Sequence, residues 1–407
     1  MDDFRETRSL RSEQDAEKRR QAKLKLERKR AQTRRLIRAA MALALAAAAI
    51  VVGQAMLGPV RLSPLTDAWR LTGRRGEGFP LDFGYSHTRQ SARVGKSLAL
   101  LGSTQLEIIT SSGYESLSEE QPYTEPSICA AGGRVALFDR ASGKLTLFSR
   151  TGELYKKDLF QPIYCVSLSK NGALAAATKS DGATCEVTAF DAKEKQRFAW
   201  RCEKEYPGAL RLADDGRALG VCLIGTEQAG VYARFAAFSF GRQEPRTDLK
   251  IPGAWLYGAS AAVGGWLAVG DQAVYFVRHG AKEPKPYSYE GRALDRFDME
   301  NDGYCAVLLA DWENQSLVRV YDKHGRLALE SGFRQKPLGL ACEGGAVYLR
   351  FEHALLRWQK GVGLRQSPLP QGAQEAVVAG RDAFVLTLRE AELARLQWGP
   401  VEDGLKV

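Results

Sequence analysis

The segments Leu168-Ser-Lys-Asn-Gly-Ala-Leu-Ala175 and Leu212-Ala-Asp-Asp-Gly-Arg-Ala-Leu219 decide the fold of this 407-residue chain. In each of them an apolar run leads into a tight turn that contains Asn or Asp before Gly, and a second apolar run follows. This is the pattern of a β-hairpin. Glu300-Asn-Asp-Gly303 repeats the turn further along the chain. A turn that recurs in this way indicates a repeat protein, in which every unit contributes a small sheet.

A second class of turn recurs within the units, at residues 148–152, 190–194 and 321–325. The apolar runs between the turns are only four to six residues long, as expected for strands: 135–138, 145–148, 173–177, 274–277, 317–321 and 346–351. The two classes of turn together give unit starts near residues 90, 127, 163, 208, 254, 294, 338 and 374. The spacing of about 36 to 46 residues is typical of four-stranded propeller blades.

The last unit, which starts at Gln374, has room for only three strands, at 375–379, 383–388 and 392–398. Residues 79–85, which precede the first unit, are the candidates for its fourth strand. A ring closed by strands from both ends of the chain leaves no free sheet edge. The sequence therefore predicts an all-β propeller of eight blades, with seven blades as the alternative if one unit is irregular.

The net charge of +10 is concentrated at the N-terminus. Residues 1–40 hold 14 Lys and Arg against 7 Asp and Glu, whereas residues 39–60 carry no charge. A helix over residues 39–60 would be about 30 Å long, the thickness of a bilayer core. Because basic residues stay on the cytoplasmic side of a spanning segment, we expect one transmembrane helix with the propeller exported from the cytoplasm. A cleaved signal peptide is the alternative, although its basic region would be unusually long.

These patterns divide the chain into five parts: a helical or disordered cytoplasmic tail (1–38), a transmembrane helix (39–60), a connector (61–78), the propeller (79–398) and a C-terminal tail (399–407). The basic tail predicts contact with anionic lipid at the cytoplasmic membrane. No aromatic residue lies between the cations of residues 18–38, so nucleic acid is not an expected partner. In the connector, Ser63 and Pro64 can start a short helix that runs to Arg70, and the glycines at 73, 76 and 78 then predict a flexible spacer.

The two hairpin phrases over 168–175 and 212–219 resemble the Ser-x-Asp-Gly-x-x-Leu-Ala phrase of bacterial WD-repeat-like and YVTN-like propellers. With its basic tail, single apolar segment and repeat domain, the whole chain is similar to an uncharacterised family of single-pass membrane proteins of Gram-positive bacteria. The Trp-Asp dipeptide of true WD repeats is missing. The resemblance implies an architecture and a location, and it implies no catalytic residue, because that family has no assigned activity.

One stretch has the alternating acids of a calcium-binding loop, with Asp298, Glu300 and Asp302 before Gly303. The acid that would complete the ligand set is absent, and hairpin geometry alone accounts for Asp302 and Gly303. The four histidines, at positions 87, 279, 324 and 353, fall in or near separate predicted turns and are not expected to converge. The chain has no nucleophile elbow and no phosphate-binding loop. We therefore predict no catalytic residue, no cofactor and no other metal ligand.

The seven cysteines are too few for a disulfide scaffold. Five of them are expected to be buried free thiols in the first or second strand of their units: Cys129, Cys165, Cys222, Cys305 and Cys342. Cys185 and Cys202 differ, because they flank the turn at 191–196. If Phe190 faces Arg197, Cys185 faces Cys202, and a cross-strand disulfide becomes possible.

No cluster of aromatic and basic residues in the propeller points to a particular sugar or nucleotide, and the tryptophans are expected to fill the spaces between blades. The sequence favours a non-catalytic binding or scaffolding module for a protein, a peptide or an envelope polymer. Two alternatives stay open. One is an enzyme that acts on a cell-envelope glycan, and the other is a transmembrane sensor that signals through the basic tail.

Overall fold

The computed structural model of the protein describes residue 41 and residues 58–82, 90–228, 230–242, 244–310 and 315–401. Contacts divide the chain into two compact units, Met1–Gly58 and Pro59–Val407. The tail at 1–38 and most of the apolar segment at 39–60 lie outside the described residues. In the part that is described, no helix is both long and apolar enough to cross a membrane.

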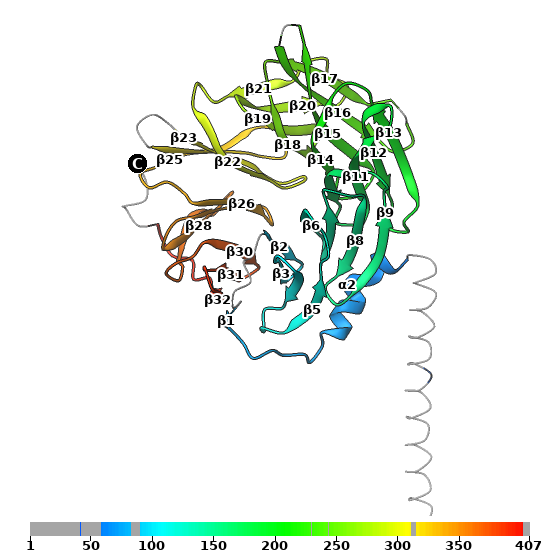
Figure 1. The fold of residues 1–407 in the computed structure, drawn as a ribbon. Coiled ribbons are helices and arrows are strands. Elements are labelled where there is room, and N and C mark those ends of the chain that lie inside the picture. The colour runs from blue at the N-terminus through cyan, green and yellow to red at the C-terminus, as the bar shows by residue number, and fades with distance from the viewer. Residues whose placement is uncertain are drawn as a thin grey trace, which may run out of the picture. The chain divides into compact units, whose positions relative to one another are not determined.

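In the described residues, the second unit contains one helix and eight sheets of four strands each (Figure 1). The helix is α2 (Pro59–Arg70). Blade 1 contains β2 Gln90–Val94, β3 Ser97–Leu101, β4 Gln105–Ile109 and β5 Glu115–Glu120, and blade 2 contains β6 Pro126–Ala131, β7 Arg134–Asp139, β8 Lys144–Ser149 and β9 Glu153–Asp158. Blade 3 contains β10 Ile163–Leu168, β11 Leu174–Ser180, β12 Ala183–Phe190 and β13 Gln196–Cys202. Blade 4 contains β14 Tyr206–Leu212, β15 Ala218–Glu227, β16 Gly230–Ser239 and β17 Thr247–Pro252.

Blades 5 to 8 continue the series around the ring. Blade 5 contains β18 Leu256–Ala262, β19 Gly265–Gly270, β20 Ala273–Arg278 and β21 Lys285–Ser288, and blade 6 contains β22 Ala293–Met299, β23 Cys305–Ala310, β24 Ser316–Tyr321 and β25 Leu327–Phe333. Blade 7 contains β26 Gly339–Glu343, β27 Ala346–Arg350, β28 Ala354–Gln359 and β29 Gly363–Pro368. Blade 8 contains β30 Glu375–Ala379, β31 Asp382–Leu386 and β32 Glu390–Arg395, together with β1 Leu81–Asp82.

The first strand of each blade lies next to the axis of the ring (Figure 1). These inner strands begin at residues 90, 126, 163, 206, 256, 293, 339 and 375, within two residues of the unit starts that the turns predict. All neighbouring strands within a blade are antiparallel. The prediction of eight blades is therefore confirmed, and the alternative of seven is excluded.

The ring is closed by a strand from the N-terminal side of the propeller. β1 pairs with β32, with Leu81 opposite Ala391. Phe79, just before β1, packs against Phe384 of β31 at 5.9 Å between ring centroids. These residues share one apolar cluster with Leu98 of blade 1, so the last blade packs against the first. The predicted closure by residues from the 79–85 segment is confirmed.

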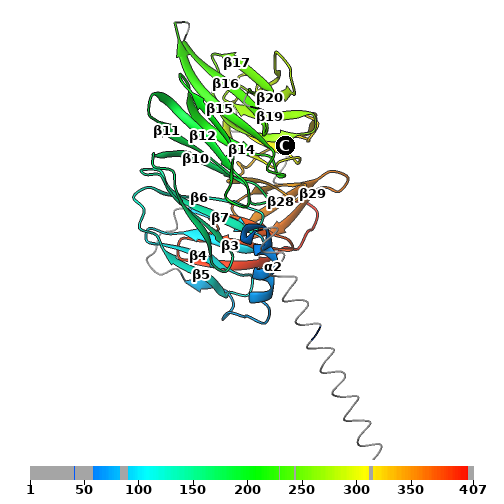
Figure 2. The same cartoon turned by 90° about the vertical axis from the view of Figure 1, so that its right-hand side faces the viewer.

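The ring has two different faces. The inner strands end at the hairpin face, where the turns to the second strands lie, and they begin at the crossover face, where the chain crosses from the outer strand of one blade to the inner strand of the next. The recurring Asn-Gly and Asp-Gly turns belong to the hairpin face. Figure 2 shows the ring from its side, with α2 lying against it.

The hairpin turns also join neighbouring blades. Asn301 lies in the turn after β22 and is 8% exposed. Its side-chain nitrogen donates to the carbonyl of Leu212 in blade 4 at 2.7 Å, and its side-chain oxygen accepts from the backbone N–H of Ala261 in blade 5 at 3.0 Å. A single amide therefore joins three blades. Because both ends of the Asn301 amide are hydrogen-bonded, this polar side chain can be buried at low cost.

Candidate functional site

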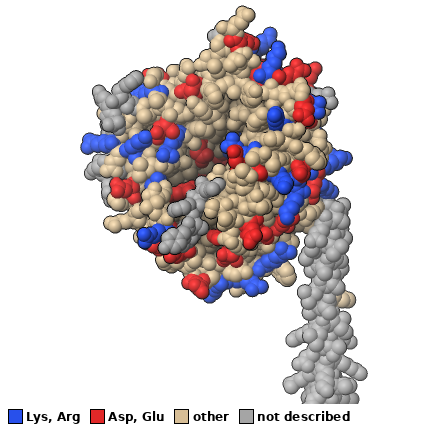
Figure 3. Space-filling model, in the orientation of Figure 1, with Lys and Arg blue, Asp and Glu red and all other residues tan. Residues whose placement is uncertain are grey.

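A cavity of about 1430 Å³ lies at the centre of the ring. The inner strands of blades 1, 2, 6, 7 and 8 provide most of its wall. Helix α2 adds Pro64 and Ala68 to the wall, and Leu71 follows directly after the helix. Figure 3 shows the ring hollowed at its centre, with basic and acidic side chains around the hollow. A concave space of this size, built on rigid strands, is the strongest candidate for a binding site.

The wall of the cavity carries charges of both signs. The cations are Arg93, Lys96, Arg150, Lys170, Arg211, Arg296 and Arg350, and the acids are Asp214, Asp295, Asp298, Glu300, Glu343 and Glu375. Several of these groups are paired across blades. Arg93 of blade 1 binds Glu343 of blade 7, and Lys170 binds Asp214 at 2.7 Å. The cavity therefore has no large region of a single sign that would attract a highly charged polymer.

Burial changes the proton affinity of these paired groups. Burial raises the pKa of Glu343, and the positive charge of Arg93 acts in the opposite direction. Burial opposes the charge on Lys170, but the hydrogen bond and charge of Asp214, with Glu300 at 3.6 Å, outweigh burial and raise the pKa of the ammonium. The Arg93–Glu343 pair therefore joins the inner strands of blades 1 and 7, and the Lys170–Asp214 pair joins the hairpin turns of blades 3 and 4.

The three acids with calcium-loop spacing face different partners. Asp298 accepts a hydrogen bond from the backbone N–H of Cys342 at 2.7 Å. Glu300 accepts from the backbone N–H of Gly345 at 3.2 Å. Asp302 occupies the left-handed region with φ of 51° and donates its own N–H to the carbonyl of Ala261. The acids thus tie blade 6 to blades 7 and 5, and within the described ranges no three His, Cys, Asp or Glu side chains are grouped to hold a metal.

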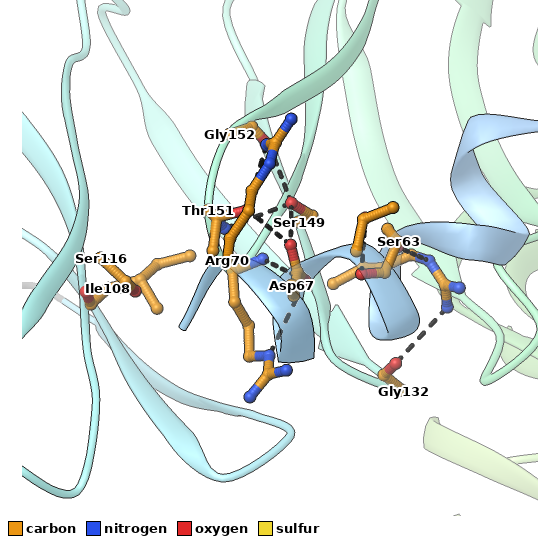
Figure 4. Close-up of polar contacts among 12 residues, drawn as sticks. Ser63, Asp67, Arg70, Ile108, Ser116, Gly132, Ser149, Thr151 and Gly152 are labelled. Atoms are coloured by element: carbon orange, nitrogen blue, oxygen red, sulfur yellow. Dashed lines mark hydrogen bonds and ion pairs between the residues drawn. The ribbon is translucent and has the colours of Figure 1, made fainter. Parts of the chain in front are cut away.

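Helix α2 is fixed to the hairpin face by a buried aspartate (Figure 4). Asp67 is 0% exposed and accepts hydrogen bonds from the hydroxyls of Ser149 and Thr151, at 2.9 and 2.6 Å. The backbone N–H of Arg150 also donates to Asp67, at 3.0 Å, and its guanidinium lies 3.7 Å away. Charge-assisted hydrogen bonds of this kind are about twice as strong as neutral ones.

The first turn of α2 is held by Arg134 of β7, which is 2% exposed. Pro64 has no N–H, so it cannot bond the carbonyl of Val60 as a helical residue would. The Nε of Arg134 donates to that carbonyl at 2.7 Å and to the hydroxyl of Ser63 at 3.0 Å. Gly172 gives the helix room, because a Cβ there would lie 2.5 Å from a methyl of Val60.

The connector therefore differs from the flexible spacer that the sequence predicts. The helix ends at Arg70, as expected, but it begins at Pro59 rather than at Ser63. Gly76 is also packed in place, since a Cβ there would lie 2.1 Å from the backbone of Gly113. The sequence does not predict the packing of α2 on the ring, because this packing depends on Arg134 and on the partners of Asp67, which lie far from the helix in the chain. A signal was present in β7, where Arg134 directly precedes the apolar run of residues 135–138.

Aromatic side chains lie on or just before the inner strands of blades 3 to 6, toward the crossover face, and two of them, Tyr164 and Phe297, are half-buried. We call Tyr164, Tyr206, Trp255, Tyr257 and Phe297 the aromatic row. Tyr206, Trp255 and Tyr257 are 58%, 45% and 45% exposed. Tyr257 lies 6.3 Å from Phe297, which lines the cavity. Burial raises the pKa of Tyr164, and the nearby Tyr206 adds to the effect. The aromatic row therefore extends from the cavity onto the face opposite α2.

Other tryptophans fill the interior, as the sequence predicts. Trp266 is 2% exposed and packs against Phe235 of the preceding blade at 6.0 Å between ring centroids. Trp358 is buried, and Trp398 packs near Tyr348. Trp312 lies outside the described residues. The sequence does not distinguish the exposed Trp255 from these buried tryptophans. A tryptophan on an open face of the ring and a tryptophan buried between two blades have the same local sequence pattern.

The histidines lie in separate turns. His279 follows β20 and His324 follows β24, both at the hairpin face, whereas His353 lies between β27 and β28 at the crossover face. His87 falls outside the described residues. The described histidines therefore do not share one face.

All seven cysteines are free thiols in the structure, and the five assigned to first or second strands lie in those strands. Cys185 is directly opposite Cys202, as predicted. The detailed register was wrong, because Phe190 faces Gln196, and a shift between Ala189 and Phe190 restores the predicted pairing beyond it. Both thiols are buried, and Cys202 lies 3.0 Å from a carboxylate oxygen of Glu205. The disulfide itself stays a prediction.

Comparison with known proteins supports the fold. Residues 82–257 match the model of a family of unknown function, DUF5711. No curated protein matches the chain. Among solved structures, the C-terminal WD40 domain of Sif2 has a TM-score of 0.53 at 11% identity, over 79% of this chain and 99% of that one.

Two further structures give similar values. A structure described as the eukaryotic initiation factor has a TM-score of 0.52 at 11% identity, over 82% of this chain and 91% of the other. The dihydro-heme d1 dehydrogenase NirN has a TM-score of 0.50 at 10% identity, over 80% and 81%. Identities this low show the fold alone. The chain is an eight-bladed β-propeller with WD40-like structural neighbours, and it is similar over residues 82–257 to a family whose function is unknown.

Proposed function

We propose that the protein is a membrane-tethered propeller that binds an extended segment of a protein, a peptide or an envelope polymer on its crossover face, outside the cytoplasmic membrane. The observation that carries this proposal is the aromatic row. Large aromatic side chains are normally buried, and a group of them on one face of a ring is typical of a binding surface. Binding would cover them at little entropic cost, because each side chain has only two rotatable bonds.

The chemistry of the cavity supports binding rather than turnover. An acid or base that takes part in catalysis has to be free to exchange a proton with a substrate. Glu343 and Asp298 are instead engaged by Arg93 and by the backbone N–H of Cys342. The balanced charge of the wall also gives no reason to expect nucleic acid as a ligand. We therefore propose a non-catalytic role, with no cofactor.

The tether is proposed from the sequence and from α2. The uncharged residues 39–60 are long enough to span a bilayer, and the basic residues before them favour a cytoplasmic N-terminus. The same basic residues are proposed to contact anionic lipid. Helix α2 begins at Pro59, directly after the apolar residues, and is itself fixed to the hairpin face.

Reporter fusions after Val407 test the proposed topology. We expect a reporter that works only outside the cytoplasm to be active on the full-length chain, and a reporter that works only in the cytoplasm to be inactive. Deletion of residues 39–57 should release the fused protein from the membrane fraction. A cytoplasmic reporter that is active after Val407 would contradict the proposed location.

Photo-crosslinking tests the binding face in living cells. Benzoylphenylalanine at position 257, in the aromatic row, should give a discrete adduct. The matched control is position 263, which is 47% exposed in the hairpin turn of the same blade. We expect no such adduct at 263. Tyr206→Ala should reduce the adduct at 257 about fivefold or more, because one aromatic anchor contributes about 1–2 kcal/mol to binding. Equal adducts at both positions, or no effect of Tyr206→Ala, would argue against the aromatic row.

A further inference from the structure

Helix α2 has an inverted distribution of polar and apolar side chains. On the side that packs against the propeller, Ser63 and Asp67 are 1% and 0% exposed. On the outward side, Leu65 and Trp69 are 70% and 79% exposed. A surface helix of a soluble domain normally directs its large apolar residues to the core. The outward apolar residues of α2 therefore need another explanation.

The exposed residues form a continuous stripe. Arg61, Leu65 and Trp69 are spaced four residues apart, so they lie one above the other on the same side of the helix. That side points away from the positions of Ser63 and Asp67, which fix the helix to the ring. We call these three residues the outward stripe. It is separate from the aromatic row, which lies on the opposite face of the propeller.

The charge around the outward stripe is mainly positive. Four exposed arginines lie on α2 or just after it: Arg61, Arg70, Arg74 and Arg75. Between residues 59 and 75 the single acid is Asp67, which is fully buried and bound to Ser149 and Thr151. Among the described residues, none of the four arginines forms an ion pair with a carboxylate. Glu77, two residues after Arg75, is also exposed, so four arginines stand against one exposed acid. A surface that combines Leu and Trp with an excess of arginines complements an anionic bilayer.

We infer that the outward stripe lies on the surface of an anionic membrane, with Leu65 and Trp69 at the level of the lipid headgroups and the arginines next to lipid phosphates. The inference rests on the proposed tether. The apolar segment ends at Val60, and Val60 is also the first buried residue of α2. The stripe therefore begins within one residue of the end of the apolar segment. Tryptophan is enriched at this depth because its ring is apolar and its N–H is polar.

Membrane contact through α2 would orient the whole propeller. The helix cannot turn relative to the ring while Arg134 and Asp67 hold it. The hairpin face would then be directed toward the bilayer, and the aromatic row on the crossover face would be directed away from it, toward a ligand.

Quenching of tryptophan fluorescence tests this inference on the full-length chain in nanodiscs that contain brominated phosphatidylcholine and phosphatidylglycerol. Trp69 is one of seven tryptophans and the first in the chain, so we expect bromine to quench a minor part of the emission. Trp69→Phe should abolish that part. Trp255→Phe, which removes an exposed ring on the crossover face, should leave the quenchable part unchanged. Quenching that persists in Trp69→Phe would overturn the inference.

The lipid composition tests the partner. Replacing phosphatidylglycerol with neutral lipid, or making Arg74→Gln with Arg75→Gln, should weaken the quenching of Trp69 by at least twofold. Equal quenching in neutral and anionic nanodiscs would overturn the choice of an anionic surface. If Trp69 is shielded from water but not quenched by bromine, a second copy or another protein covers it instead, and the inference fails. A chain that does not enter nanodiscs at all would contradict the proposed tether itself.

Discussion

Replacing Phe384 with alanine is expected to lower the free energy of unfolding by about 3–5 kcal/mol. Phe384 is 0% exposed and packs against Phe79, beside the strand that closes the ring. It also belongs to the apolar cluster that joins blade 8 to Leu98 and Leu100 of blade 1. The truncation would leave a cavity at the one place where the ring is held by strands from both ends of the chain. Denaturant unfolding of the full-length protein in detergent measures the loss.

Phe160→Ala is the matched control, because the Phe160 side chain is 87% exposed. We expect this variant to unfold within about 0.5 kcal/mol of the wild type. An equal loss in both variants would show that the closing contact has no special weight.

Replacing Asp67 with alanine is expected to release α2 from the hairpin face. The carboxylate accepts three hydrogen bonds, from Ser149, Thr151 and the backbone of Arg150. Their loss should weaken docking by about 3 kcal/mol, or roughly a hundredfold in the docking equilibrium. Hydrogen exchange of the amides of residues 62–71 measures the release directly. The blades themselves should keep their protection, because no strand pairing depends on Asp67.

Two further variants give this result its meaning. Asp67→Asn keeps an acceptor oxygen of the same size and should cause a smaller loss of protection. Thr72→Ala, just beyond the helix, removes an exposed hydroxyl that donates only to Ala68 and should have little effect. Unchanged exchange in Asp67→Ala would show that Val60 and Arg134 hold the helix without it.

The repeat could be predicted from the sequence because it is written in local patterns. A Gly that follows Asn or Asp fixes a tight turn, and the apolar runs on either side have the length of strands. The two classes of turn together therefore place the eight inner strands within two residues. Closure by residues 79–85 followed from simple counting, since the last unit is one strand short.

Contacts between distant residues could not be predicted in the same way. The hydrogen bonds that fix α2 to the ring join Asp67 to Ser149 and Arg134 to Val60, and no local sequence pattern pairs these residues. The acids at 298, 300 and 302 have the spacing of a metal loop, but the fold directs the carboxylates of Asp298 and Glu300 to backbone N–H groups of blade 7. The aromatic row was missed for a related reason, because a strand pattern does not say which end of a blade is left uncovered.

The closure by β1 has a consequence for the order of folding. Leu81 and Asp82 are synthesised early, whereas their partners Glu390 and Ala391 follow about 300 residues later. Until then β1 has no partner strand, and an unpaired edge of this kind invites aggregation. The ring can be completed only after β32 has been synthesised. A chain that stops before β32 lacks the closing strand pair altogether. The pairing of β1 with β32 is therefore the structural feature that distinguishes a complete ring from an incomplete one.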